Sequence, residues 1–255
     1  MTTYNNAITK LFSEKEKLVI IGLTGRTGSG CSTAANILSK EYSQLDLQYD
    51  KCIGSIPAHQ YKFEIIKEYI SSDNRWLPFT KIEGSCVILS YIFSEKSSPE
   101  NCCDTFIGYL TKLQKETDDI SFQIDNFDDL VKEIQGLEYI FKAVQKLPLE
   151  NLNINEPNDI EPYYNLYIEK FPEYKARFRK ILSKYSCYEE KKKKIQDEPP
   201  VKYHLYTYLL QKIGNNIRAS GNPYESTFSQ DKIFSFAERL DLLTQTSHMN
   251  FSYAP

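Results

Sequence analysis

The residues Gly25 to Ser32 have the spacing of a phosphate-binding loop, G-x-x-x-x-G-K-[ST]. A strand with the apolar character of a buried one, 17–25, leads into this loop, and a helix that begins with small residues follows it. Glycines permit positive φ angles and close approach of backbone N–H groups to oxygen, and the start of a helix favours an anion. The expected phosphate ligands are Gly25, Arg26, Thr27, Gly28, Ser29, Gly30, Cys31, Ser32 and Thr33.

Cys31 occupies the position of the lysine in this loop. The lysine normally places a positive charge on the β- and γ-phosphates, and phosphoryl transfer depends on that charge. We therefore expect binding without fast hydrolysis or transfer. Arg26 could supply the missing cation as a catalytic residue, and it could equally be a solvent-facing arginine. Ser32 is the expected Mg²⁺ ligand, with ATP, GTP or a dNTP as the nucleotide. The alternative is a tight strand-to-helix turn whose small residues serve packing alone.

The segment 201–220 has apolar residues at every fourth position, which predicts one buried face of a helix. These residues are Leu205, Leu209, Ile213 and Ile217. At about 100° per residue the opposite side carries His204, Thr207, Gln211, Gly214 and Arg218. Gln211 and Arg218 could bind a nucleobase edge and a phosphate, and a glycine within a helix costs stability. The alternative is an ordinary solvated helix face.

The segment Lys170–Lys194 carries ten lysines and arginines with aromatic residues between them. Such a pattern can stack on nucleic acid. Tyr174, Phe178 and Tyr185 recur at helical spacing, however, and this spacing favours burial on one face of a helix. A nucleic-acid-binding helical module is therefore kept only as an alternative function.

The composition is that of a globular protein, with 41% hydrophobic residues, 25% charged residues and a net charge of −3. The apolar run Leu18–Leu23 is far too short to span a bilayer, and the first residues lack the apolar region of a secretory signal. We expect a cytoplasmic protein. Six cysteines without a C-x-x-C pair and three scattered histidines predict reduced thiols rather than a zinc site or a disulfide framework.

Three parts follow from these patterns. Residues 1–96 hold the first part of a P-loop core, which includes a strand ending near Glu83 and a helix from Gly84 or Ser85. Residues 97–200 lack apolar strand runs and predict a helical insertion. Residues 201–255 hold the second part of the core.

Turn and breaker residues refine this division. The stretch 153–162 is expected to be a loop, and 189–200 is expected to be a helix end that runs into a linker. Gly221-Asn222-Pro223 should end the helix 201–220, and another helix is expected over 230–246.

A strand that carries a magnesium-ordering aspartate is expected beside the first strand of a P-loop core. The nearest match, "ISFQID", is interrupted by Ser121 and Gln123, and its Asp125 lies in the region expected to be helical. We therefore expect the core to be truncated at Pro255, before that strand. Such a core would leave an unpaired sheet edge and lean on a partner.

"IGLTGRTGSGCST" and "LLQKIGNNIRASGNPY" together resemble the N-terminal P-loop domain of the bacterial anti-phage deoxycytidylate (dCTP/dCMP) deaminases. That domain is similar to deoxynucleoside monophosphate kinases and dephospho-CoA kinase. The resemblance covers the loop and the helix near the end, and it does not cover the helical middle. It implies an α/β fold, a nucleoside monophosphate kinase-like P-loop NTPase with a parallel sheet and a large helical insertion. In the kinase relatives the equivalent glutamine and arginine line the acceptor nucleotide site, which supports Gln211 and Arg218.

The deaminase signature, H-x-E with P-C-x-x-C, is absent from this sequence. The resemblance therefore implies the nucleotide-sensing or regulatory part of a deoxycytidylate deaminase in antiviral defence, with the deaminase domain in cis or on a partner chain. The alternative within the enzymes is an active deoxynucleotide kinase-like phosphotransferase. Besides the nucleotide, a second copy in a homo-oligomer is a compatible partner, whereas neither a membrane nor nucleic acid is expected.

Overall fold

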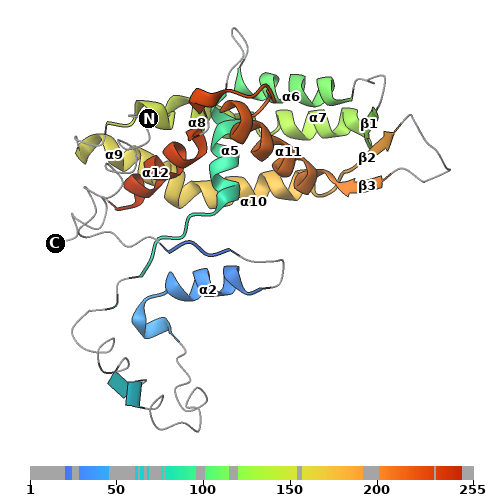
Figure 1. The fold of residues 1–255 in the computed structure, drawn as a ribbon. Helices are drawn as coiled ribbons and strands as arrows, with labels where there is room; N and C mark the ends of the chain where they lie inside the picture. Colours follow the sequence, from blue (N-terminus) through green and yellow to red (C-terminus); the bar gives the residue numbers. More distant parts are fainter. Residues whose placement is uncertain are drawn as a thin grey trace. The chain divides into compact units, whose positions relative to one another are not determined.

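The computed structural model divides the chain into two compact units, Met1–Lys81 and Ile82–Pro255. The structure describes residues 21–24, 29–45, 61–62, 64–65, 68, 76, 78–95, 101–114, 120–153, 157–191, 201–232 and 234–248. These residues are mostly helical and include one small antiparallel sheet (Figure 1). The described strands do not form the parallel P-loop sheet that the sequence predicts, so this finer fold assignment stays a proposal. No described helix is both long enough and apolar enough to cross a membrane.

The first unit contains helix α2, Cys31–Leu38, and a 3-10 turn, Tyr42–Gln44. Three hydrogen bonds tie α2 to the segment before the second unit. Phe79 N–H donates to the Leu38 carbonyl at 2.9 Å, Trp76 Nε1 donates to the Lys40 carbonyl at 2.8 Å, and Lys81 Nζ donates to Asn36 Oδ1 at 2.9 Å. None of the described residues of this unit is buried.

The second unit is a bundle of helices with the sheet at one end (Figure 1). Its helices are α5 Gly84–Ser94, α6 Cys102–Leu113, α7 Phe127–Gln135, α8 Glu138–Lys146, α9 Pro157–Tyr164, α10 Phe171–Leu182, α11 Leu205–Ser220 and α12 Ser235–His248. Short 3-10 turns cover Leu149–Asn151 and Gln230–Lys232, and a π-helical turn, Asn165–Lys170, joins α9 to α10.

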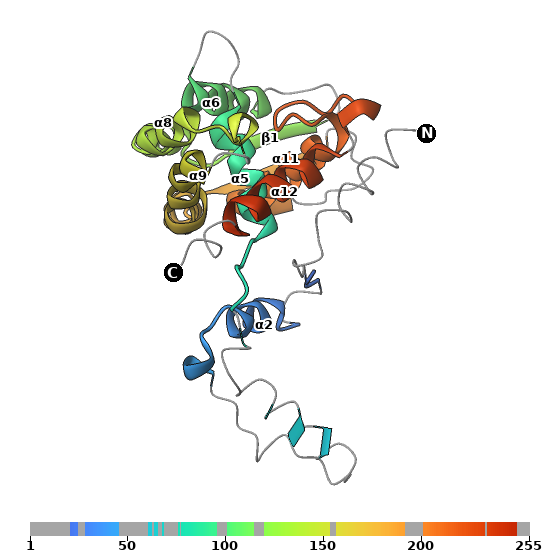
Figure 2. The same cartoon turned by 90° about the vertical axis from the view of Figure 1, so that its left-hand side faces the viewer.

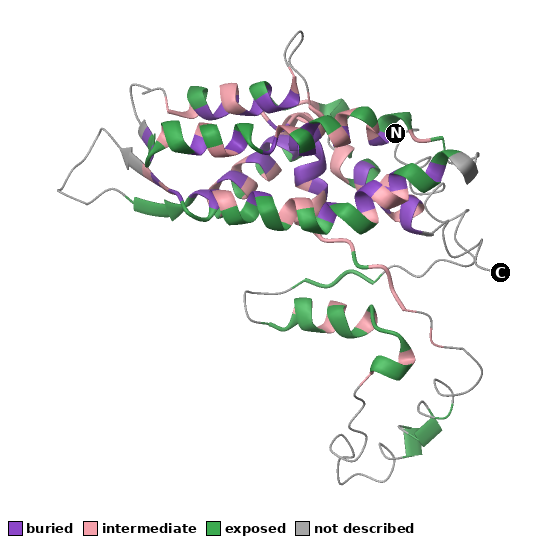
Figure 3. Cartoon of the chain, turned by 180° about the vertical axis from the view of Figure 1, so that it is seen from behind, coloured by how far each residue is buried: buried purple, intermediate pink, exposed green. Residues whose placement is uncertain are grey.

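Helix α5 forms the centre of this bundle. Six of its residues are buried: Val87, Leu89, Ser90, Tyr91, Ile92 and Phe93. A helix that is apolar on all sides must be enclosed, and α5 packs against α6, α8, α10, α11 and α12 (Figures 2 and 3). The Phe93 ring meets the rings of Phe141 and Phe178 edge-on, with centroids 4.9 Å and 5.2 Å away. Aromatic rings together with aliphatic side chains therefore form the core around α5.

The sheet joins the end of α10 to the start of α11. Its strands are β1 Ile120–Ile124, β2 Ser186–Lys191 and β3 Val201–His204, in the order β1-β2-β3 and antiparallel throughout. Phe122 and Ile124 are buried, whereas Gln123 is exposed, so β1 has one inner and one solvated face. Leu205 N–H donates to the Tyr185 carbonyl at 3.1 Å, which fixes where α11 begins.

Several elements differ from the sequence-based predictions. "ISFQI" is strand β1 rather than part of a helical region, and it is antiparallel to its neighbour. Its alternation of apolar and polar residues is typical of a strand with one solvent-exposed face. The polar residues Ser121 and Gln123 are therefore compatible with the strand. Residues 186–191 form β2 instead of a helix end, and 201–204 form β3 instead of a first helical turn. These two strands are stabilised by pairing with each other. The residues of each segment taken alone have a helical pattern, so the sequence did not predict either strand.

Two further predictions failed locally, whereas the start of α5 and the end of α11 were confirmed. The helix expected over 230–246 begins later, because α12 covers Ser235–His248 and a separate 3-10 turn covers Gln230–Lys232. Part of the expected loop 153–162 is helix α9, and residues 78–83 form no strand before α5. Helix α5 begins at Gly84 as expected, and Gly221 ends α11 with φ at 74° in the left-handed region that glycine favours. The expected part boundaries near residues 96 and 200 depend on the parallel sheet and stay a prediction.

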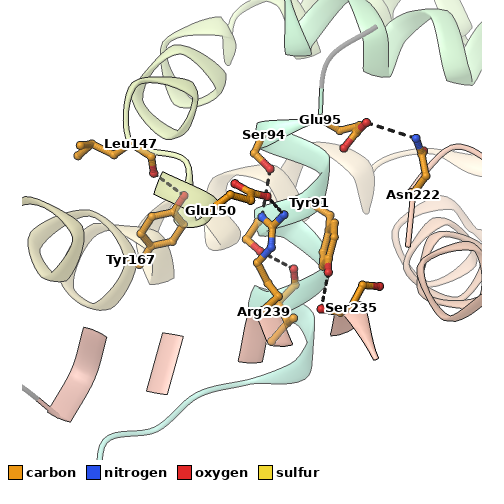
Figure 4. A network of polar contacts seen from close by, with 11 residues as sticks. Tyr91, Ser94, Glu95, Leu147, Glu150, Tyr167, Asn222, Ser235 and Arg239 are labelled. Atoms are coloured by element: carbon orange, nitrogen blue, oxygen red, sulfur yellow. Dashed lines mark hydrogen bonds and ion pairs between the residues drawn. The ribbon is translucent and has the colours of Figure 1, made fainter. Parts of the chain in front are cut away.

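A polar network links α12 to the centre of the bundle (Figure 4). The Arg239 side chain is only 6% exposed and forms an ion pair with Glu150. Its guanidinium lies 3.9 Å from the centroid of the Tyr91 ring and donates to Ser94 Oγ at 3.2 Å. The Tyr91 hydroxyl in turn donates to the Ser235 carbonyl at 2.7 Å. The fold tolerates this buried guanidinium charge because Glu150, Ser94 and the Tyr91 ring all contact it.

We expect Arg239→Ala to lower the free energy of unfolding by about 2–4 kcal/mol, because it removes a buried ion pair and a cation–π contact together. The control is Arg177→Ala, which removes an exposed ion pair with Glu173 and exposed contacts with Tyr139, and it should cost less than about 1 kcal/mol. Chemical denaturation of both variants measures the difference. Equal stability losses would show that the Arg239 network does not hold the bundle together.

Glu95 gives the bundle a defined pH dependence. Burial raises the pKa of its carboxyl, with the Arg239 charge opposing the shift and Glu150 and Glu225 adding to it. A carboxyl whose pKa is higher in the folded state makes folding less favourable as pH rises through the interval between the unfolded and folded pKa values. We expect Glu95→Gln, which keeps an acceptor for Asn222, to raise the melting temperature at pH 8 and to lose that advantage near pH 4. Melting curves across this range test the sign.

Candidate phosphate-binding site

The start of α2 is the described part of the phosphate-binding motif. Gly30 precedes the helix with φ at 83° and ψ at 7°, a left-handed conformation that side chains with a Cβ rarely adopt. A Cβ built at Gly30 would meet no atom within 4 Å, so the space beside it is open. The helix that the sequence predicts after the glycines is therefore confirmed, and it begins at Cys31.

The first turn of α2 is open to an anion. The first intrahelical bond runs from Ala34 N–H to the Gly30 carbonyl at 2.8 Å, and the N–H groups before it have no partner within a helix. No side chain caps this end, and no acidic residue lies in the first turn. Ser32 and Thr33 are exposed. Free N–H groups together with the helix dipole favour phosphate here.

Cys31 replaces the lysine without replacing its charge. Its Sγ lies 3.2 Å from Ser29 Oγ, so the two side chains bond each other across the turn. Gly25, Arg26, Thr27 and Gly28 lie outside the described residues, and the strand expected over 17–25 is described only at 21–24. Residues 21–24 are exposed and form no strand. A catalytic role for Arg26 stays a prediction.

The donors present suit magnesium that arrives with a nucleotide. The described residues contain no group of three or more His, Cys, Asp or Glu side chains that could hold a metal by themselves. Mg²⁺ usually keeps several waters and takes one or two protein ligands together with substrate phosphates. The exposed hydroxyl of Ser32 can be such a ligand, so the site fits a metal–nucleotide complex better than a resident ion.

The second candidate group lies on α11, in the other compact unit. The apolar stripe is confirmed, since Leu205, Leu209, Ile213 and Ile217 are all buried. Gln211 and Arg218 are exposed, and an Arg218 guanidinium nitrogen donates to Asn215 Oδ1. His204 lies in β3 and not on the helix. That Gln211 and Arg218 share a nucleotide with the loop stays a prediction.

Gly214 has a packing role that the sequence did not reveal. A Cβ built there would approach Ile88 Cδ1 to 3.2 Å, because α5 passes close to α11 at this point. The helix-destabilising glycine is therefore explained by the approach of two helices, without a ligand.

The aromatic residues of the basic segment 170–194 pack as expected. Phe178 and Tyr185 are buried, and Tyr174 meets the Tyr139 ring edge-on with a centroid distance of 6.2 Å. These rings are not available for stacking on nucleic acid. The cysteines among the described residues are free thiols, and burial raises the pKa of Cys103 to about 12, which makes it unreactive.

Two groups of polar and aromatic residues were not found from the sequence. One is the Arg239 network, whose members are far apart along the chain. The other is at the start of α11, where the half-buried Tyr208 ring contacts those of Phe122 and Tyr203, at centroid distances of 4.8 Å and 5.5 Å. The absence of acidic residues from 201–220 was the signal that could have drawn attention to it.

Comparison with family models, with curated proteins and with solved structures finds no match to this chain. The resemblance to the deaminase-associated P-loop domain thus depends on the motif residues themselves. The functional assignment follows from the start of α2 and stays a proposal.

We expect Gly214→Leu to destabilise the helical unit by about 1–3 kcal/mol, because the larger side chain overpacks the contact with Ile88. Gln211→Leu places the same side chain on the exposed side of α11 and should change stability by less than about 0.5 kcal/mol. Urea denaturation followed by circular dichroism compares the two variants. A fully stable Gly214→Leu protein would contradict the close helix contact.

Proposed function

We propose that the loop ending at α2 binds the phosphates of a nucleoside triphosphate, ATP, GTP or a dNTP, with Mg²⁺. We further propose that the chain is the nucleotide-sensing or regulatory part of an anti-phage deoxycytidylate deaminase. The deaminase site itself would lie in cis or on a partner chain, because this sequence lacks its zinc-binding signature.

The observation that carries the proposal is the helix start at Gly30 and Cys31. A left-handed glycine, an uncapped first turn and an exposed Ser32 hydroxyl occur there in the order that the loop motif requires. Ser29, Gly30 and Ser32 are exposed and therefore accessible to a ligand.

The missing lysine supports sensing rather than phosphoryl transfer. Backbone N–H groups and the helix dipole can hold the phosphates in the ground state without it. Transfer requires additional positive charge on the γ-phosphate as the bond breaks. Among the described residues of the loop, none carries such a charge.

We expect Ser32→Ala to weaken Mg²⁺–nucleotide binding by about tenfold or more, since hydrogen bonds to charged groups contribute about 1.5–3 kcal/mol. Ser39→Ala is the matched control, because Ser39 lies at the other end of the same helix and bonds only the Asn36 carbonyl. Calorimetric titration with ATP, GTP and dNTPs, with and without magnesium, measures both. Gly30→Val is a poor probe, because its positive φ would strain the helix start as well.

Three results would contradict the proposal in different ways. No heat with any nucleotide would remove phosphate binding itself. Steady phosphate release by the unchanged protein, abolished in Ser32→Ala, would replace the sensor with an active kinase-like phosphotransferase. Equal affinities of the Ser32→Ala and Ser39→Ala proteins would place the nucleotide elsewhere.

A further inference from the structure

The segment that forms β3 and α11 combines cations and rings without any acidic residue. Residues 201–220 contain three lysines or arginines, three tyrosines and no aspartate or glutamate, in a protein of net charge −3. The buried stripe of α11 leaves its other side to solvent, and each residue of β3, which leads into the helix, belongs to the exposed class (Figure 3). A segment of cations without acidic residues attracts anions.

Rings and cations are interleaved at the start of this surface. The Tyr203 ring is 37% exposed and lies beside the Tyr208 ring. Lys212 Nζ lies 5.6 Å from the centroid of the Tyr208 ring, and the Arg179 guanidinium lies 5.7 Å from the Tyr206 ring on the other flank of α11. The sheet and α10 thus bring a ring and a cation to each flank of the helix.

The cations of this surface are not neutralised by carboxylates. Arg179, Lys212 and Arg218 form no ion pair with any of the described residues, whereas Lys132, Lys142 and Arg177 elsewhere on the bundle are each paired with an acid. Asn215 and Gln211 are exposed along the same side and offer amide groups. We call Arg179, Tyr203, Tyr208, Lys212 and Arg218 the α11 surface.

The dimensions of the α11 surface indicate whether its ligand is one nucleotide or a single strand of nucleic acid. Helix α11 rises by about 18 Å, at 1.5 Å per residue, between Tyr206, beside which Arg179 lies, and Arg218. One mononucleotide cannot reach cations at both ends of that length, and mononucleotide sites are concave, whereas the outer side of a helix is convex. A single strand carries a phosphate every few ångströms and exposes base faces for stacking.

We propose that the α11 surface binds single-stranded nucleic acid. Lys212 and Arg218 contact phosphates along the exposed side of α11, Arg179 contacts a phosphate at the flank next to α10, and Tyr203 stacks on a base. An acidic peptide would use the cations without the rings, and a duplex would keep its base faces covered, so both would bind more weakly. This inference does not rest on nucleotide binding by the loop at α2.

The test is fluorescence anisotropy of the full chain with labelled 20-nucleotide oligo(dT) and oligo(U), at several salt concentrations. The combined variant Arg179→Gln, Lys212→Gln and Arg218→Gln should bind about tenfold more weakly or worse at low salt, and its slope of log K against log salt should fall by about 2, at about 0.7 per lost phosphate contact. The control is Lys132→Gln, Lys142→Gln and Arg177→Gln, which makes the same change in net charge on paired cations and should bind as the unchanged protein does.

The stacking part has its own variants. Tyr203→Ala should weaken binding by about fivefold or more, and Tyr203→Phe should restore it, because the ring and not the hydroxyl stacks. Circular dichroism melting curves identify any variant that fails to fold, and Tyr203→Phe keeps the test valid if Tyr203→Ala is such a variant.

Three results would overturn the inference. They are no binding of either oligonucleotide at low salt, equal loss of binding in the two triple variants, and displacement of the oligonucleotide by an equal charge of polyglutamate. Whether or not Ser32→Ala loses mononucleotide binding, the oligonucleotide results are unchanged. The two proposals can therefore fail separately.

Discussion

The fold of the second unit depends on the enclosure of α5. The helix has the sequence "GSCVILSYIFS", which offers no polar face to water, so the other helices must surround it. Aromatic rings from α8 and α10 meet Phe93 from different sides and fill the space between the helices. Enclosing an apolar helix removes a large apolar surface from water, and the stabilisation that this gives exceeds that of any single polar contact. The enclosure of α5 therefore determines where the remaining helices lie.

Enclosure of α5 also determines which side of α11 is free for function. Gly214 allows α11 to approach Ile88 of α5, and the apolar stripe of α11 is buried in the same core. The polar side of α11 is left outside as a consequence of this packing. The start of α2 is accessible without such packing, since its glycine and small residues are exposed. One surface suits an extended anion and the other suits compact phosphates.

The sequence predicted features that depend on neighbouring residues. The helix after Gly30, the start of α5 at Gly84 and the left-handed end of α11 at Gly221 are each decided within a few residues. The buried stripe of α11 was predictable for the same reason.

The features that the sequence did not predict join distant residues. Ile120 pairs with Lys191, and a strand of five residues shows little signal until its partner is known. The burial of Arg239 depends on Tyr91 and Glu150, which lie far from it in sequence. A charged residue in an ordinary amphipathic helix gives no sign that its charge will be enclosed. The missed surface of α11 likewise needed Arg179, which α10 supplies.

The central claim is that backbone N–H groups at the start of α2 hold a nucleotide's phosphates. Amide chemical shifts of the isotope-labelled protein report on those groups directly during titration with a magnesium–nucleotide complex. The account predicts that the largest shifts occur at the amides of residues 29–34, because phosphate oxygens replace water as their acceptors. Shifts confined to α11, with none at residues 29–34, would contradict it.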